Sequence, residues 1–311
     1  MVEVPVLYIT FCRPEYARLS FDAIKRAQPR KLYFYSNKAR EDRPDEVRRN
    51  EEVRAFVKEI DWDCEVVTWF RNEYVDMYTS LWGAMDWLFD NEEKGIVLEE
   101  DCVASEAFFT YCEKMLEFYK DDKRVSIISG NNRYPDLAPE GVDYYLTKMV
   151  DIYGWANWAD RWKSLDRNMT DWPKSRMLLF KYFGRFIQAL WRMFWFERVY
   201  RKIDHYNPWD VISSYNRSKD FTYGIVPVCD LVKDIGTYGE NHHVKANNSQ
   251  KQDTKTISFS DYISLYNDCQ KHDLHLYNEY EWKSFSRKLR KSLSYLSKRF
   301  LQKYLKIDLF K

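Results

Sequence analysis

Glycine is scarce in this chain of 311 residues, which contains nine glycines and nine prolines. Glycine is therefore about 3% of the residues against an ordinary usage of about 7%, which argues against collagenous, linker-like and disordered chains. No two glycines form G-x-G, and the phosphate-binding sequence G-x-x-x-x-G-K-[ST] does not occur. A nucleotide, if bound, is held by neither of these glycine-rich loops.

Cysteine pairs and long apolar runs are also missing. The six cysteines are scattered without C-x-x-C spacing, so we expect free thiols in a reducing cytoplasm. No apolar run approaches the roughly 18 residues that span a bilayer. Residues 1–16 lack a basic segment followed by an apolar one, which is the pattern of a secretory leader. The sequence predicts a cytoplasmic protein whose membrane contact is peripheral.

The net charge of +1 averages two unlike parts of the chain. Residues 282–311 contain ten Lys and Arg and one acid, and the rest of the chain is acidic. Apolar residues recur in this tail at the spacing of one helical face: Phe285, Leu289, Leu293, Leu296, Phe300 and Tyr304. A basic amphipathic helix predicts an anionic membrane surface as a partner, and the alternative is a terminal helix packed on the body. Nucleic acid is the less favoured anionic partner, because the body is acidic and no nucleic-acid motif occurs.

The first 130 residues alternate apolar runs of strand length with longer amphipathic stretches. We expect strands at residues 4–11, 31–36, 64–69, 95–98 and 125–129, and helices at 16–27, 45–58, 74–89 and 105–119. Alternation of this kind predicts an α/β fold, with a mostly parallel sheet and helices on both faces. Ligands of such sheets bind at the carboxyl ends of the strands.

Aromatic residues dominate the chain beyond residue 130. Residues 180–200 hold nine aromatics, and residues 174–202 hold eight Lys and Arg but only one acid, Glu197. We expect this helical insertion to pack its aromatic face on the sheet, with a membrane interface or a sugar-binding platform as alternatives. The predicted organisation is a domain over residues 1–250, with halves at 1–132 and 133–250, and an extension at 251–311.

Acidic residues are concentrated where the fourth predicted strand ends. Glu99, Glu100 and Asp101 follow the apolar run 95–98 directly. Three adjacent carboxylates repel one another unless a cation lies among them, and hard oxygen ligands suit Mg²⁺ or Mn²⁺. A solvated acidic turn is the alternative. Arg13 follows the first predicted strand and Asn37 the second, so both are expected at the same edge of the sheet.

Six stretches in order carry a resemblance to a known family. They are residues 5–14 (PVLYITFCRP), 95–109 (GIVLEEDCVASEAFF), 125–132 (VSIISGNN), 153–162 (YGWANWADRW), 208–212 (PWDVI) and 227–243. The chain resembles the bacterial nucleotide-diphospho-sugar transferases of GT-A fold, which are related to N-acetylglucosaminyltransferase I. This resemblance implies a glycosyltransferase with a Rossmann-like sheet.

The resemblance implies roles for the acids at the fourth strand end and for their neighbours. Glu99, Glu100 and Asp101 match the Glu-Asp-Asp version of the D-x-D motif. Asp101 would ligate the divalent ion on the donor diphosphate, and Glu100 would touch the ribose or the sugar. Arg13 matches an arginine that helps to hold the donor nucleotide, and Asn37 stands where relatives place an aspartate beside the uracil or ribose.

The resemblance also implies a catalytic base and a phosphate contact in the second half. Asp210 matches the acid that serves as base in inverting relatives, because an attacking hydroxyl must lose its proton. Its alternative role is that of a residue in the first turn of a helix. His242 or His243 would add a donor or a ligand at the β-phosphate, and a solvated loop is the alternative for this pair.

These expectations predict a metal-dependent, inverting glycosyltransferase. It would move a sugar from UDP to a hydroxyl of a glycan or lipid-linked acceptor in surface polysaccharide assembly, on the inner face of the plasma membrane. A sugar-phosphate nucleotidyltransferase is the first alternative, although its usual glycine-rich loop is absent after residues 4–11. The others are a nucleic-acid-binding module and a sugar-binding relative without activity.

Overall fold

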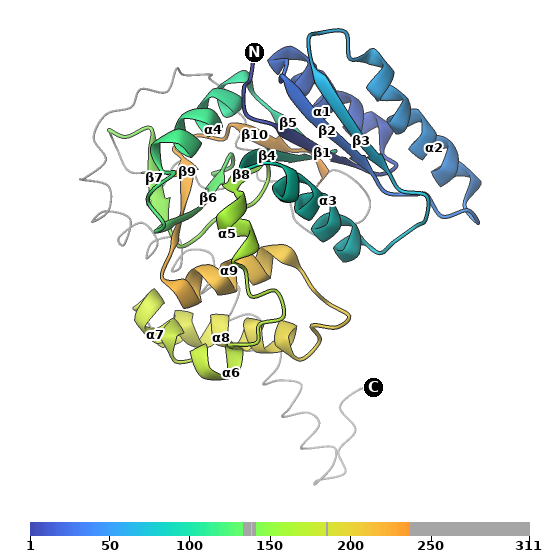
Figure 1. Ribbon diagram of the computed structural model, residues 1–311. Helices are drawn as coiled ribbons and strands as arrows, with labels where there is room; N and C mark the ends of the chain where they lie inside the picture. Colours follow the sequence, from blue (N-terminus) through green and yellow to red (C-terminus); the bar gives the residue numbers. More distant parts are fainter. Residues whose placement is uncertain (133–137, 139–140, 185, 237–311) are drawn as a thin grey trace, which may run out of the picture.

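A computed structural model describes residues 1–132, 138, 141–184 and 186–236 (Figure 1). An eight-stranded sheet lies at its centre, in the order β3-β2-β1-β4-β8-β6-β9-β7. The strands are β1 (Val6–Thr10), β2 (Lys31–Ser36), β3 (Glu65–Phe70), β4 (Lys94–Glu99), β6 (Val125–Ser129), β7 (Tyr144–Thr147), β8 (Trp155–Trp158) and β9 (Tyr223–Pro227). Strands β1 to β4 are parallel, as are β6 and β9, whereas β7 and β8 run against their neighbours. The predicted α/β fold with a mostly parallel sheet is confirmed.

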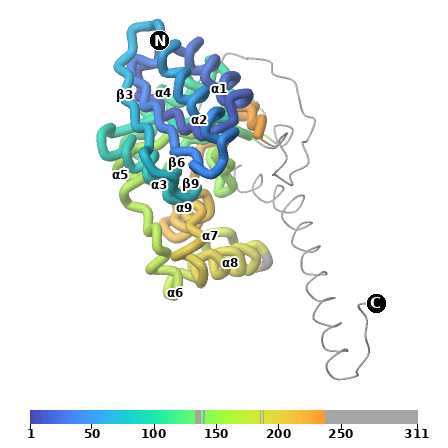
Figure 2. Tube along the Cα trace, turned by 90° about the vertical axis from the view of Figure 1, so that its right-hand side faces the viewer, coloured from blue at the N-terminus to red at the C-terminus, as the bar shows by residue number. Residues whose placement is uncertain are grey.

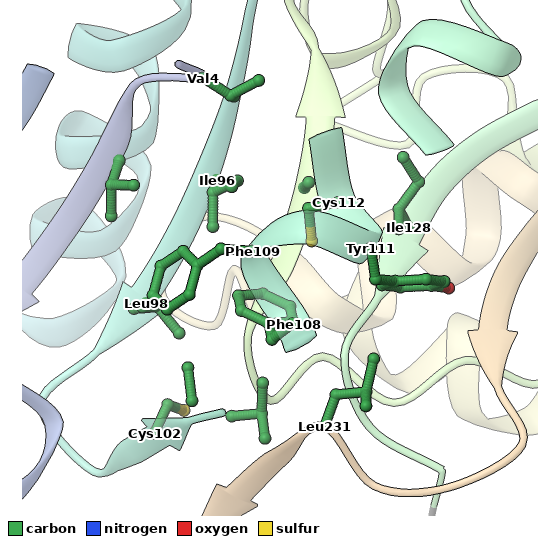
Figure 3. Close-up of a cluster of buried hydrophobic side chains, with 14 of the residues drawn as sticks. Val4, Ile96, Leu98, Cys102, Phe108, Phe109, Tyr111, Cys112, Ile128 and Leu231 are labelled. Carbon is green, nitrogen blue, oxygen red and sulfur yellow. The ribbon is translucent and has the colours of Figure 1, made fainter. Parts of the chain in front are cut away.

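Helices cover both faces of this sheet (Figures 1 and 2). They are α1 (Pro14–Ala27), α2 (Pro44–Ala55), α3 (Met77–Asn91), α4 (Glu106–Phe118), α5 (Ala159–Lys163), α6 (Trp172–Ser175), α7 (Leu178–Phe183), α8 (Phe186–Tyr200) and α9 (Trp209–Asp220). Alternate residues of β1 enter two separate cores, because successive side chains of a strand point to opposite faces. Val6 and Tyr8 join the core under α1 and α4, part of which Figure 3 shows. Leu7 and Ile9 join the core that α3 and the helices after residue 158 cover.

Two predicted helices differ from the structure at their ends for local reasons. The helix expected over residues 74–89 begins at Met77, because the Asp76 carboxylate caps it by accepting hydrogen bonds from the backbone N–H groups of Tyr78 and Thr79. The helix expected over 45–58 ends at Ala55 and continues as a 3₁₀ turn, Phe56–Glu59.

A second, two-stranded sheet brings the end of the described chain back to the acids after β4. Strand β5 (Cys102–Ala104) pairs antiparallel with β10 (Val232–Asp234). The backbone N–H of Ile235 donates to the Asp101 carbonyl at 2.9 Å. Gly154 permits this close approach, since it has a φ of +65° and a Cβ there would stand 2.7 Å from Val232 Cγ2.

Part of the aromatic region is buried, although α8 packs on α7 and α9 and so does not lie directly on the sheet as expected (Figure 1). Its large buried rings are Trp155, Trp162, Trp172, Tyr182 and Phe196, of which Trp172 and Phe196 pack on each other and on Tyr215 of α9. On α8, however, Phe186 and Phe194 are 69% and 66% exposed. Core packing therefore accounts for only part of the aromatic excess.

The predicted division of the chain into a domain, its two halves and an extension stays a prediction. The halves expected on either side of residue 132 share one sheet, because β7, β8 and β9 pair into it. The extension over 251–311, with its basic helix, lies outside the described residues, as do His242 and His243. In the part that the structure describes, no helix is long and apolar enough to cross a membrane. The five cysteines of that part are free thiols.

Candidate active site

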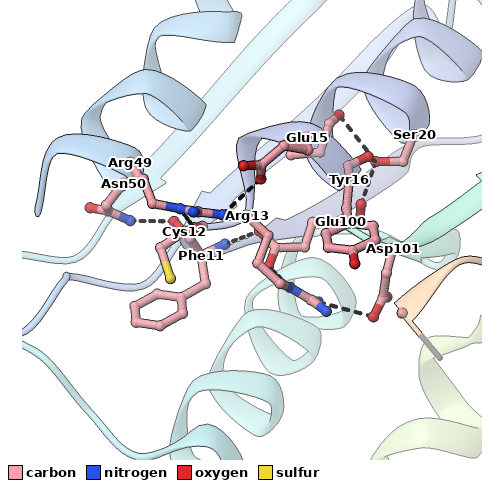
Figure 4. A network of polar contacts seen from close by, with 12 residues as sticks. Phe11, Cys12, Arg13, Glu15, Tyr16, Ser20, Arg49, Asn50, Glu100 and Asp101 are labelled. Atoms are coloured by element: carbon pink, nitrogen blue, oxygen red, sulfur yellow. Dashed lines mark hydrogen bonds and ion pairs between the residues drawn. The ribbon is translucent and has the colours of Figure 1, made fainter. Parts of the chain in front are cut away.

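Arg13 joins the ends of β1 and β4 at the carboxyl edge of the sheet (Figure 4). It stands before Pro14, which opens α1 as its first residue. Its Nε donates to Glu100 Oε1 at 2.6 Å and its Nη2 to Asp101 Oδ2 at 2.9 Å. The backbone N–H of Phe11 donates to the other oxygen of Glu100 at 2.7 Å. The Arg13 guanidinium therefore binds two adjacent carboxylates at this edge.

The three acids after β4 differ in their surroundings. Glu100 is 4% exposed, and burial raises the pKa of its carboxyl group while the Arg13 guanidinium opposes the rise. Burial also raises the pKa of Glu99 to about 8, and the negative charge of Asp101 adds to that rise. Asp101 is half-buried, and its Oδ2 accepts from Arg13.

Asp210 lies in the first turn of α9, as predicted. The turn before it is held by aromatic side chains from two other elements. Trp209 packs on Trp155 of β8, with ring centroids 4.7 Å apart. Trp82 of α3 donates its indole N–H to the Asn207 carbonyl at 3.1 Å. The tryptophans of this region thus fix where the Asp210 carboxylate stands.

The Asp210 carboxylate belongs to the same electrostatic cluster as the acids after β4. Its negative charge contributes to the raised pKa of Glu99, after burial and the charge of Asp101. Although the Asp210 side chain reaches solvent, the protein atoms crowded around it raise its pKa above the ordinary value. The backbone N–H of Val211 opposes that rise, and the nearby charge of Asp151 adds to it.

The residues around Asp101 fit a divalent cation. A Cβ placed on Gly236 would stand 2.3 Å from Asp101 Oδ2 and 3.2 Å from Asp234 Oδ1, so both carboxylate oxygens lie close to Gly236, where they accept hydrogen bonds from Arg13 and from the Gly236 N–H. Mg²⁺ is often held by one or two carboxylates, with phosphate and water oxygens as its other ligands. Across the described ranges, no three His, Cys, Asp or Glu side chains form a group that could hold a metal. Asp101 and Asp234 would therefore share the ion with a bound substrate.

Asn37 lies at the next strand end, and its amide group is engaged within the protein. Its Nδ2 donates to the Val75 carbonyl at 2.8 Å, and its Oδ1 accepts from the backbone N–H of Lys38 at 3.0 Å. On α2, Asn50 donates to the carbonyls of Phe11 and Asn37. These bonds hold the ends of β1 and β2 and the segment after β3 together.

The structure thus brings four of the predicted site residues together at the ends of β1 and β4, namely Arg13, Glu99, Glu100 and Asp101, and the charge of Asp210 acts on Glu99. Asn37 is on the same edge but is 5% exposed, so its contact with a ribose or base stays a prediction. The sugar contact of Glu100 also stays a prediction, because both of its oxygens already accept hydrogen bonds. The role of the histidine pair falls on residues that are not described.

Sequence reasoning missed Asp234, Asp151 and Asn50. Asp234 carried only a weak signal, because Lys233 separates it from the two apolar residues Leu231 and Val232. Asp151 contributes to the Asp210 pKa, yet it lies between β7 and β8 in a segment with no strand-end pattern. Asn50 sits in a helix among charged residues, where one amide gives no signal.

The comparisons with known proteins identify no family. No family model matches this chain, and no curated protein matches it in sequence. The resemblance to the GT-A nucleotide-diphospho-sugar transferases therefore rests on the residues quoted for it.

Among solved structures, the chain is similar to several enzymes. One is the glycosyltransferase GlyE of Streptococcus pneumoniae TIGR4, at 9% identity over 53% of this chain and 36% of that one, with a TM-score of 0.32. Another is the mannosyltransferase PcManGT of Pyrobaculum calidifontis in complex with GDP-Man and Mn²⁺, at 13% identity over 69% and 73% of the two chains, with a TM-score of 0.35. A third is apo-UDP-glucose pyrophosphorylase, at 9% identity over 75% and 92%, with a TM-score of 0.37. These scores are too low to carry an argument about activity.

Proposed function

We propose that this chain is a divalent-cation-dependent glycosyltransferase, which moves a sugar from a nucleotide diphosphate to an acceptor hydroxyl with inversion. The observation that carries the proposal is the pairing of Arg13 with Glu100 and Asp101 at the ends of β1 and β4, with Asp210 near enough for its charge to act on Glu99. The proposed cation ligands are Asp101, which follows β4, and Asp234 of β10, and the candidate base comes from the start of α9. A donor diphosphate and an acceptor hydroxyl need these two functions side by side.

The donor side uses Asp101 and Arg13. Asp101 and Asp234 would hold Mg²⁺ or Mn²⁺, which neutralises charge developing on the departing diphosphate when it is bound. Arg13 carries a fixed positive charge at the same edge and can turn from Asp101 toward a phosphate oxygen. Glu100, buried and bonded to Arg13 Nε, keeps the arginine in place during that exchange. UDP is the nucleotide that the family resemblance favours.

The acceptor side uses Asp210. An ionised carboxylate there would accept the proton of the attacking hydroxyl as the bond to the anomeric carbon forms. Its raised pKa makes its ionised form a stronger base than an ordinary aspartate. The acceptor we propose is a glycan or a lipid-linked sugar in surface polysaccharide assembly, at the inner face of the plasma membrane.

A nucleotidyltransferase on a similar sheet is the alternative reaction. Such enzymes usually surround their triphosphate with a glycine-rich loop after the first strand. Here only Phe11, Cys12 and Arg13 separate β1 from α1, and the Phe11 backbone N–H is already bonded to Glu100. This short connection favours the transfer of a sugar over the transfer of a nucleotide.

The products formed from nucleotide sugars test the proposal. Purified chain incubated with a panel of UDP-sugars and Mn²⁺, without an acceptor, is expected to release UDP slowly by transfer of the sugar to water. Proton NMR of the fresh product should show the anomeric configuration opposite to that of the donor. Chelation of the cation should stop the reaction.

Addition of pyrophosphate provides the discriminating control. A nucleotidyltransferase would convert the UDP-sugar and pyrophosphate into UTP and a sugar 1-phosphate. Formation of these products without UDP release would overturn the glycosyltransferase proposal. Retention of the donor's configuration would leave a glycosyltransferase but remove Asp210 as an inverting base.

A substitution at Gly236 gives a second test of the proposed cation site. Gly236→Ala is expected to displace the Asp101 carboxylate, because the new methyl group would stand 2.3 Å from its Oδ2. We expect the cation-dependent part of the UDP affinity to fall by about 10- to 100-fold, as changes around metal ligands commonly cause. Calorimetric titration with and without Mn²⁺ measures it. An unchanged cation dependence at an unchanged melting temperature would show that Asp101 need not occupy this position.

A further inference from the structure

The outer surface of α8 carries an apolar stripe that the fold leaves uncovered. Phe186, Leu190 and Phe194 follow one another at helical spacing and are 69%, 42% and 66% exposed. Trp195 stands beside them at 36%. We call these four residues the α8 stripe. Large rings in a contiguous exposed row are unusual on a monomer and mark an interaction surface.

The charges around the α8 stripe are almost all positive. Residues 174–202 contain eight Lys and Arg and one acid, Glu197. Arg176 and Arg201 already neutralise that acid, at 2.7 Å each. Arg198 continues the line of the stripe one turn after Phe194, and Lys202 follows just past the helix end. Both are exposed, and neither makes an ion pair within the described part of the chain.

The stripe lies at one end of the molecule. Figures 1 and 2 both place α6, α7 and α8 together, away from α1 and α2. Helix α8 packs against α7 and α9, and α9 begins beside Asp210. A partner that binds the outer surface of α8 would therefore lie at the same end of the molecule as the start of α9.

We propose that the α8 stripe inserts into the interface of an anionic membrane. Aromatic and aliphatic side chains beside unpaired cations match the boundary between acyl chains and acidic headgroups, where rings lie in the apolar layer and Arg or Lys reach phosphates. The acidic remainder of the body is repelled by the same surface, which orients the molecule with α8 toward the lipid. This proposal concerns residues 186–195 and not the basic helix expected from the sequence of 282–311, and it holds whatever reaction the site catalyses.

Flotation of the full chain with vesicles tests this proposal. We expect binding to phosphatidylcholine vesicles that contain about 30% phosphatidylglycerol, and weak binding to pure phosphatidylcholine. Phe186→Asp combined with Phe194→Asp should lower the partition coefficient at least about tenfold, because each change places a carboxylate in the apolar layer. Arg198→Glu combined with Lys202→Glu should lower it most at low salt.

Matched variants separate the α8 stripe from other surfaces. Leu19→Asp changes an apolar residue on α1 that is 51% exposed, and it should leave vesicle binding unchanged. Arg287→Glu combined with Lys288→Glu changes the tail. Absence of binding to acidic vesicles overturns the proposal, and so does binding that the tail variant abolishes but the Phe186 and Phe194 variant does not. A dimer in sedimentation that Phe194→Asp dissociates would also overturn it, because a second copy then covers the stripe.

Discussion

Asp101→Asn is expected to abolish the cation-dependent part of donor binding. The substitution keeps the shape of the side chain but removes the charge of a carboxylate that, like Asp234, lies close to Gly236. Loss of a direct ligand should exceed the roughly 10- to 100-fold effect of changes around metal ligands. Titration of UDP with and without Mn²⁺ should therefore show similar, weak affinities for the variant and a large difference for the wild type.

A neighbouring acid provides the control for Asp101. Glu106 is exposed in the first turn of α4, and Glu106→Gln removes one negative charge close by in sequence without altering the strand end. Its cation dependence should equal that of the wild type. If Asp101→Asn retains the wild-type affinity for UDP both with and without manganese, the cation is not held by Asp101.

Asp210→Asn is expected to lower kcat by on the order of 100- to 10,000-fold, the range that positioned general bases contribute. Donor affinity should change little, because the role proposed for Asp210 concerns the acceptor and the proposed cation ligands remain. The wild-type rate should fall as the pH drops through the Asp210 pKa, since only the ionised form accepts a proton. Burial raises that pKa, so the acid limb of the pH–rate profile should lie above the ordinary range of aspartate.

The same helix supplies the control for Asp210. Asp220 is the last residue of α9, and Asp220→Asn removes a carboxylate from the far end of that helix. It should leave both kcat and the acid limb unchanged. Activity of Asp210→Asn within a few-fold of the wild type, with the acid limb retained, would remove Asp210 from the mechanism.

The strands and helices of the first 130 residues could be predicted closely from the sequence, because their signals are local. Each apolar run of strand length became a strand, and the acids that follow β4 could be placed at its carboxyl end. Helix ends were less accurate where one side chain decided them, as Asp76 does for α3. A capping carboxylate can start a helix later than the periodic pattern of apolar residues indicates. The periodicity alone does not show at which residue the helix begins.

The rest of the candidate site depends on contacts between distant segments. Nothing near Asp101 in sequence indicates that Asp234 returns to it, because the pairing of β5 with β10 forms only in the folded chain. The position of Asp210 could be predicted within its helix but not relative to Glu99. That relation depends on Trp82 and Trp155, which fix the start of α9 from two other elements.

The pairing of β5 with β10 also has a consequence for the order of folding. The two carboxylates of the proposed cation site, Asp101 and Asp234, belong to segments that are synthesised early and late. Contacts between residues so far apart in sequence form slowly during folding. A nascent chain that has folded β1 to β4 would hold Arg13 and Asp101 but would lack Asp234 and Asp210. Assembly of the site therefore waits for the last described strands, so the proposed catalysis can begin only in chains that have been translated past β10.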